Sequence, residues 1–102
     1  MKFSVVIPCF NEEKGILNQI TEVIKYIKIY KINAEIVVID DGSTDNTLDI
    51  IKKINYKKIK LHSNLINSGY GYSVKKGIEL ASSENIIILD GDMTYPFSDI
   101  NK

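Results

Sequence analysis

Several features that define other classes of protein are scarce or missing in this sequence. The single cysteine, Cys9, excludes an internal disulfide and a cysteine-based zinc site, and it fits a reducing compartment. No stretch approaches the roughly 20 consecutive apolar residues that a membrane-spanning helix needs. The apolar run at 3–8 is too short for the core of a signal peptide and is not followed by a small-residue cleavage site. We therefore expect a soluble, cytoplasmic protein.

An excess of charge of either sign is also missing. The 13 basic and 13 acidic residues cancel, so the composition gives no electrostatic reason to expect binding to nucleic acid or to an anionic membrane surface. The chain has 102 residues, of which 44% are hydrophobic and 25% are charged, as in an ordinary globular domain. We find no internal repeat, low-complexity tract or linker. A single domain over residues 1–102 is expected.

Four apolar segments alternate with three segments of helical periodicity. The predicted strands are 3–8, 35–39, 58–62 and 85–89; the third alternates in polarity and belongs near an edge, whereas the others are expected to be buried. The first helix is predicted to be capped by Asn11, with Glu12 and Glu13 in its first turn, and to end near residue 31. Thr44 or Asp45 is expected to cap the second. The third follows a polar, glycine-rich loop at 64–72 and ends near residue 81. This order predicts an α/β fold with a doubly wound, mainly parallel sheet.

Polar groups follow three of the four predicted strands. Asn11 and Glu12 follow the first strand, Asp40 and Asp41 follow the second, and the segment 90–92 (DGD) follows the fourth. In an open parallel α/β sheet, the carboxyl ends of the strands line the crevice that binds a ligand. An acidic crevice suits a divalent cation and, through the cation, a phosphate-bearing ligand.

Two of these acidic groups each allow two interpretations. Asp90 and Asp92 provide hard oxygen ligands for Mg²⁺ or Mn²⁺, but the same pattern also occurs in solvated turns. Asp41 can accept an N–H of a nucleobase, whereas the alternative is a helix cap combined with a turn. Cys9 is interpreted as a small hydrophobic residue behind the crevice, because no candidate base lies near it in sequence.

Four motifs, taken together, resemble the family-two glycosyltransferases. These are VVIPCFNEE (5–13), VVIDDGSTDNT (37–47), NSGYGYSVKKGI (67–78) and ILDGDMTYP (88–96), which occur in the order and spacing of that family. The last two are most similar to the polyprenyl-phosphate hexose synthase branch, which includes the dolichyl-phosphate-mannose synthases. The resemblance implies an inverting enzyme of the GT-A fold that uses a nucleotide-diphosphate sugar, linked to UDP or GDP.

The resemblance also implies roles for particular residues at the nucleotide. Pro8, Phe10 and Glu12 would border the nucleoside. Ile39 would contribute its backbone, and Asp41 would accept the N–H of the base.

At the diphosphate, the resemblance implies a divalent cation, Mg²⁺ or Mn²⁺. Asp90 and Asp92 would hold this cation, and catalysis within this chain would act only through it. Thr94 would be a further polar ligand, and Gly91 would lie close to the nucleotide.

The sequence departs from the family in its length. Only ten residues follow Asp92, whereas the family continues into the region that shapes the acceptor site. We therefore expect a donor-binding part, truncated relative to the family. Its acceptor would be a polyprenyl phosphate, reached peripherally at the inner membrane face, and its C-terminal end would mediate homo-oligomerisation. The alternatives are a nucleotide-binding or partner-binding half-domain without turnover and, more remotely, a haloacid-dehalogenase-type phosphatase, whose D-x-D-x-T strand ILDGDMTY also fits.

Overall fold

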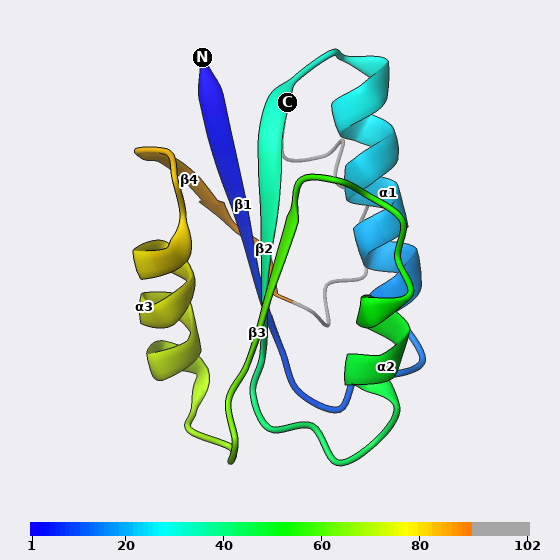
Figure 1. Ribbon diagram of the computed structural model, residues 1–102, viewed down its shortest axis with the longest axis vertical. Coiled ribbons are helices and arrows are strands. Elements are labelled where there is room, and N and C mark those ends of the chain that lie inside the picture. The colour runs from blue at the N-terminus through cyan, green and yellow to red at the C-terminus, as the bar shows by residue number, and fades with distance from the viewer. Residues whose placement is uncertain (91–102) are drawn as a thin grey trace.

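The protein is described from a computed structural model, and residues 1–90 are the part that the structure describes (Figure 1). Its elements in chain order are β1 (Lys2–Cys9), α1 (Ile16–Ile29), β2 (Asn33–Asp40), α2 (Thr47–Lys52), β3 (Ile59–Ser63), α3 (Tyr70–Leu80) and β4 (Asn85–Ile88). The strands form one sheet in the order β3-β2-β1-β4, and every neighbouring pair is parallel. The predicted alternation of strands and helices is therefore confirmed, with boundaries shifted by a few residues.

Helices cover both faces of this sheet, as Figure 1 shows. Helices α1 and α2 lie on one face, where Ile16, Ile20 and Val23 of α1 are buried against Val5 and Ile36 of the central strands. Helix α3 lies on the other face. Successive side chains of a strand point to opposite faces of the sheet. The residues that alternate with Val5 and Ile36 along these strands therefore form a second, smaller hydrophobic cluster beneath α3, which consists of Val6, Val37 and Ile39. The central strands β1 and β2 are thus buried on both faces, as their unbroken aliphatic runs predict.

Helix α3 packs closely on β1 because it carries a glycine at the contact. A Cβ atom added to Gly77 would lie 2.3 Å from Cγ1 of Val6, which is closer than any real side chain allows. At the C-terminal end of α3, the carboxylate of Glu35 on β2 accepts hydrogen bonds from Ser82 N–H (2.6 Å) and Ser4 Oγ (2.6 Å) and pairs with Lys60 Nζ at 3.0 Å. Burial by itself would raise the pKa of Glu35, but these hydrogen bonds outweigh it and lower the pKa to about 2. The carboxylate therefore stays ionised and ties α3 to the sheet.

The predicted caps of the first two helices are wrong. Helix α1 begins at Ile16 after Gly15 and has no acidic residue in its first turn, so Asn11 does not cap it and Glu12 and Glu13 lie in the preceding turn. Asn46, rather than Thr44 or Asp45, is the capping residue of α2, although it makes no side-chain capping hydrogen bond.

The polar side chains that were expected to cap these helices connect the two strand-exit loops instead. Asn11 Oδ1 accepts a hydrogen bond from Thr44 N–H (2.8 Å), and Glu13 Oε1 accepts one from Asn46 N–H (3.0 Å). Asp45 Oδ1 still accepts from Thr47 N–H (2.9 Å), at the first residue of α2. Asn11 and Glu13 thus have the chemistry of capping residues but bind a distant loop, whereas Asp45 binds the start of its own helix.

Strand β4 also differs from the prediction of a buried strand. It is at one edge of the described sheet, beside β1, and Ile88 is 40% exposed. The other edge is β3, as its alternating sequence predicts. Within residues 1–90, no helix combines the length and the apolarity needed to cross a lipid bilayer.

Candidate functional site

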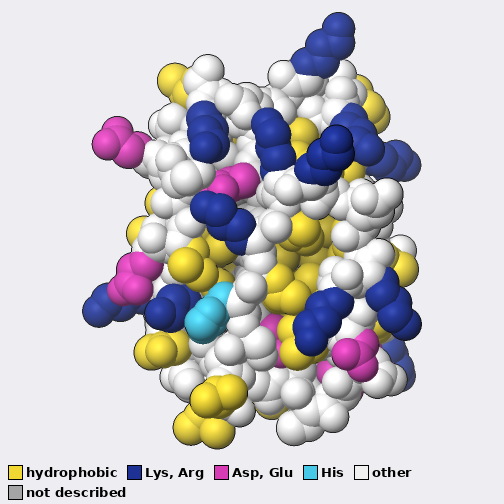
Figure 2. Space-filling view, viewed as in Figure 1, with side chains coloured by type: hydrophobic (Ala, Val, Ile, Leu, Met, Phe, Trp, Pro, Cys, Tyr) yellow, Lys and Arg dark blue, Asp and Glu magenta, His cyan; other side chains and the backbone are white. Residues whose placement is uncertain are grey.

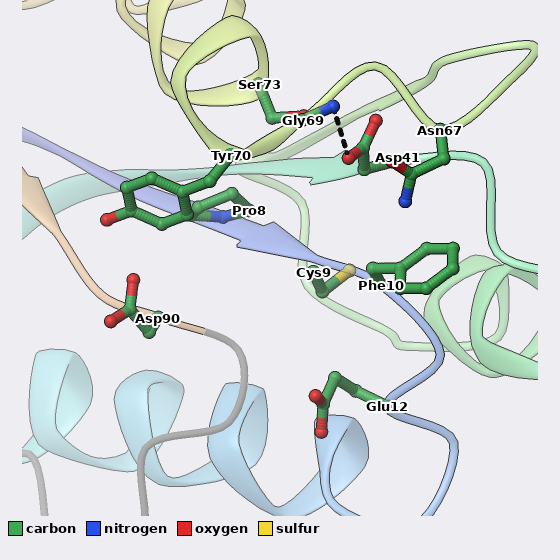
Figure 3. Close-up of a pocket in the computed structure, with 10 residues that line it drawn as sticks. All are labelled: Pro8, Cys9, Phe10, Glu12, Asp41, Asn67, Gly69, Tyr70, Ser73 and Asp90. Atoms are coloured by element: carbon green, nitrogen blue, oxygen red, sulfur yellow. Dashed lines mark hydrogen bonds between the residues drawn. The ribbon is translucent and has the colours of Figure 1, made fainter.

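A pocket of about 410 Å³ lies at the carboxyl ends of the strands. Its lining residues come from segments far apart in the sequence: Pro8, Cys9, Phe10, Glu12, Asp41, Asn67, Gly69, Tyr70, Ser73 and Asp90. Figure 3 shows Asp41 and the residues of the loop before α3 on one side, and Glu12 and Asp90 on the other. The predicted convergence of three strand ends is therefore present in the structure.

Five of the residues that were predicted to form the site line this pocket. Pro8, Phe10 and Glu12 come from the end of β1 and the turn that follows it, Asp41 follows β2, and Asp90 follows β4. Ile39 does not line the pocket, because its side chain is fully buried in the cluster beneath α3. Three other predicted site residues, Gly91, Asp92 and Thr94, lie outside the described residues.

The carboxylate of Asp41 is buried and holds the loop between β3 and α3. Its Oδ1 atom accepts hydrogen bonds from Asn64 Nδ2 (2.8 Å) and from Ser68 N–H (2.7 Å). Its Oδ2 atom accepts one from Gly69 N–H at 3.0 Å, drawn as a dashed line in Figure 3. Because a carboxylate offers about four acceptor positions, Oδ2 retains capacity for one further donor.

The next residue, Gly42, lets the same loop come close. Its φ of +71° favours glycine, and a Cβ atom added there would lie 2.6 Å from the backbone of Ile66 and Asn67. The glycine and the preceding carboxylate thus act together: one admits the loop, and the other binds it. The two features explain why Asp41 and Gly42 follow β2 directly.

Asp40, the first of the two adjacent aspartates, makes its hydrogen bonds within the protein rather than at the pocket. Its carboxylate accepts hydrogen bonds from the hydroxyls of Ser43 and Ser63, and its carbonyl oxygen accepts one from Asn64 N–H (2.8 Å). Asp40 is buried and does not line the pocket. The two neighbouring carboxylates therefore do not share one environment, and each is surrounded by its own donors.

Asp90 presents a buried oxygen at the pocket. Gln19 Nε2, from α1, donates a hydrogen bond to the carbonyl oxygen of Asp90 at 2.6 Å. The side-chain Oδ1 of Asp90 is buried and accepts no hydrogen bond within the described part of the chain. A buried acceptor without a donor is costly, so this oxygen fits a cation or a ligand donor. Residues 1–90 by themselves contain no group of three potential metal ligands.

Cys9 lines the pocket but is not suited to be a nucleophile. Burial raises its pKa to about 12, and the nearby carboxylates of Asp40 and Glu12 add to the effect. The thiol therefore stays protonated near neutral pH, as expected for a small hydrophobic residue.

The loop before α3 and the first turn of α3 supply pocket residues that were not predicted to belong to the site: Asn67 and Gly69 from the loop, and Tyr70 and Ser73 from the helix. The sequence feature that could have pointed to these residues is the NSGYGYS motif. In the structure, Gly69 of this motif has a φ of +101° and Ser73 is fully buried. Its glycine spacing points to an unusual loop but does not show that the loop turns back over the end of β2.

Comparison with known proteins identifies the family. The sequence model of glycosyl transferase family 2 matches residues 4–102, which is nearly the whole chain. The chain belongs to glycosyl transferase family 2. This match favours the transferase interpretation over the phosphatase, which leaves the three upstream motifs unexplained.

Known members of the family resemble this chain in both sequence and structure. It is 38% identical to the dolichyl-phosphate beta-glucosyltransferase of Saccharomyces cerevisiae over 97% of this chain and 32% of the yeast protein. It is 35% identical to the Staphylococcus aureus TarS 1–349 structure in complex with UDP-GlcNAc, with a TM-score of 0.78 over 90% of this chain and 27% of that one. The chain also matches the structure of a Pyrobaculum calidifontis mannosyltransferase in complex with GDP-Man and Mn²⁺, with a TM-score of 0.80 over 95% of this chain and 29% of that one. Because the two sequences are only 22% identical, this match supports the fold alone. The predicted GT-A fold is confirmed.

The chain is much shorter than these relatives. It spans 32–34% of the length of the dolichyl-phosphate beta-glucosyltransferases that it matches.

Proposed function

We propose that this chain is the donor-binding part of an inverting glycosyltransferase and that the pocket binds a nucleotide-diphosphate sugar linked to UDP or GDP. The observation that carries this proposal is the convergence of all four family motifs on one pocket at the carboxyl ends of the strands. The TarS structure in complex with UDP-GlcNAc, at 35% identity, supports a nucleotide sugar as the ligand.

The residues of the pocket suit the parts of a nucleotide. Phe10 and Pro8 offer an apolar surface against which a nucleoside can pack. Asp41 accepts the N–H of the base through the remaining acceptor position of its carboxylate. Since the side chain of Ile39 is buried elsewhere, that residue can contribute only its backbone.

A divalent cation, Mg²⁺ or Mn²⁺, is proposed to be held by Asp90 together with Asp92 and Thr94. The buried Oδ1 of Asp90, which accepts no hydrogen bond from residues 1–90, fits such a cation, because an acceptor-only oxygen in this position needs a positive partner. When bound, the cation would offset the negative charge of the diphosphate beside the carboxylates.

The acceptor of the whole enzyme is proposed to be a polyprenyl phosphate at the membrane surface. The similarity to the yeast dolichyl-phosphate beta-glucosyltransferase supports this class of acceptor. A phosphate acceptor is already ionised at neutral pH, so its attack needs little help from a general base. The 102-residue chain is expected to bind the donor but to show no detectable transfer alone, because it does not position the acceptor.

Calorimetric titration with UDP and GDP tests the donor proposal. In the presence of Mn²⁺, one of the two nucleotides should bind, and chelation should weaken that binding at least about tenfold, because phosphates and carboxylates repel without a cation. Asp90→Asn should reduce the effect of Mn²⁺, whereas Asp49→Asn, on the exposed side of α2, should leave it unchanged.

The possible results separate the parts of the proposal. Equal affinity with Mn²⁺ and with chelator would contradict the role of the metal. Absence of binding in both conditions, in a chain that is folded by circular dichroism, would contradict the donor site itself. Robust transfer to a polyprenyl phosphate by the chain alone would contradict its assignment as a donor-binding part only.

A further inference from the structure

The loop between β3 and α3 exposes two adjacent aliphatic side chains at its tip. Leu65 is 99% exposed and Ile66 is 73% exposed. Figure 2 shows hydrophobic side chains projecting at the lower end of the molecule, where Figure 1 shows the turn between these two elements. Apolar residues scattered singly are common on protein surfaces, whereas apolar side chains that are exposed side by side point to an interaction site.

This exposure is built into the fold. At the base of the loop, Asn64 Nδ2, Ser68 N–H and Gly69 N–H all donate to the buried carboxylate of Asp41. Gly42, next to Asp41, lies directly against the backbone of Ile66. Because both ends of the tip are fixed, Leu65 and Ile66 are presented to solvent without the entropy cost of ordering the loop on binding.

The surrounding residues have the character of a membrane–water interface. Tyr70 and Tyr72, at the start of α3, are each more than half exposed. Tyrosine favours the level of lipid headgroups, where its ring is apolar and its hydroxyl is hydrated. The segment 63–78 contains Lys75 and Lys76 but no aspartate or glutamate, although the chain as a whole is neutral. Lys76 lies 4.0 Å from Glu79, just beyond this segment.

We propose that Leu65 and Ile66 insert into the surface of a lipid bilayer with anionic headgroups, with Tyr70 and Tyr72 at headgroup level. A tip of two side chains is too small for a stable protein interface, which buries roughly 1,200–2,000 Å². A fluid bilayer adapts its shape to such a tip. The lysines of the same segment complement anionic headgroups.

The insertion would bring the proposed donor site to the membrane. Asn67, Gly69 and Tyr70, immediately after the inserted tip, line the pocket. The mouth of the pocket would therefore lie at the lipid surface, within reach of the phosphate of a polyprenyl phosphate; this step rests on the proposed function. Binding through two side chains is weak and reversible, since even a single myristoyl chain gives only marginal membrane binding.

A tryptophan reporter tests the insertion directly, because the sequence contains no tryptophan. Leu65→Trp should shift its emission to the blue on addition of vesicles of phosphatidylcholine and phosphatidylglycerol, and brominated lipids should quench it. Leu17→Trp is the matched control, since Leu17 is also more than half exposed but lies on α1. Its emission should not respond to either kind of vesicle.

Vesicle sedimentation then measures how much the tip contributes. The double variant Leu65→Ser with Ile66→Ser should bind about tenfold more weakly, because two exposed aliphatic groups no longer enter the bilayer. The matched double variant Leu17→Ser with Ile29→Ser removes two α1 residues of the same types, both more than half exposed, and should bind like the parent chain. Added salt should weaken binding in both the parent and the control.

Three results would overturn the proposal: equal vesicle binding by all variants, an unshifted Leu65→Trp emission, or an emission that depends on protein concentration rather than on lipid. The last would indicate contact with a second copy of the chain. Nucleotide titration of the same variants keeps the two proposals apart. If the tip inserts but no nucleotide binds, the donor proposal fails and the membrane contact remains.

Discussion

At the scale of single residues, Asp41 links the stability of the pocket to its proposed ligand. Its carboxylate accepts hydrogen bonds from Asn64, Ser68 and Gly69, which lie 23, 27 and 28 residues further along the chain. The same side chain lines the pocket and has one acceptor position left. A substitution at this residue should therefore change both the folding and the binding of the protein.

Asp41→Asn should lower the free energy of unfolding by about 1–3 kcal/mol. The amide replaces one acceptor oxygen with an NH₂ group, which would face one of the donors that the carboxylate now satisfies. Chemical denaturation measures this loss. Asp49→Asn is the control, because Asp49 is exposed on α2 and should change the stability by less than about 0.5 kcal/mol.

The same variant tests recognition of the base. In the fraction that remains folded, nucleotide affinity should fall by roughly 1.5–3 kcal/mol, the usual contribution of a hydrogen bond to a charged group, while the dependence on metal is retained. Unchanged affinity in a folded but less stable variant would show that Asp41 only holds the loop.

At the scale of elements, aliphatic runs and helical periodicity were sufficient to predict every strand and helix, because each element must bury one face or both. The caps were not predictable in the same way. Asn11 and Glu13 have the chemistry of capping residues, but their partners are the backbone N–H groups of Thr44 and Asn46 in another loop. Local sequence gives the donors and acceptors available to a side chain, and only the tertiary fold decides which of them meet.

The glycines of α3 provide a prediction at this scale. Gly77→Ala should destabilise the protein by about 1–3 kcal/mol, because the new methyl group would collide with Val6, whose branched side chain cannot easily turn away. Gly71→Ala, in the same helix, meets no atom within 4 Å and should stabilise the protein by up to about 1 kcal/mol through helix propensity. Thermal or chemical denaturation of both variants measures the difference. A Gly77→Ala variant as stable as the parent chain would mean that α3 does not depend on close contact at Gly77.

At the scale of the whole molecule, the strand order brings the motifs together. Strand β4 pairs with β1, although 75 residues separate the end of β1 from the start of β4. The alternation of elements predicted a parallel sheet whose carboxyl ends form a crevice, so the positions of Glu12, Asp41 and Asp90 could be anticipated. The order of the strands could not, because an aliphatic run is compatible with several places in a sheet. This is also why β4 was expected to be buried, whereas it lies at one edge of the sheet that residues 1–90 form.

The edge position of β4 leads to a prediction about association. Among residues 1–90, its outer edge has no neighbouring strand, and Ile88 is substantially exposed there. Open edges with apolar side chains favour pairing between molecules, so the chain should form dimers or larger assemblies at high concentration. Sedimentation velocity over a range of concentrations should show this association.

Ile88→Lys should shift the equilibrium towards monomer, because a charge at an edge opposes pairing, whereas Ile29→Lys, on the exposed end of α1, should not. The Leu65→Ser and Ile66→Ser double variant should associate like the parent chain, since its tip is expected to contact lipid rather than a second copy. A parent chain that remains monomeric at high concentration would show that the β4 edge is protected.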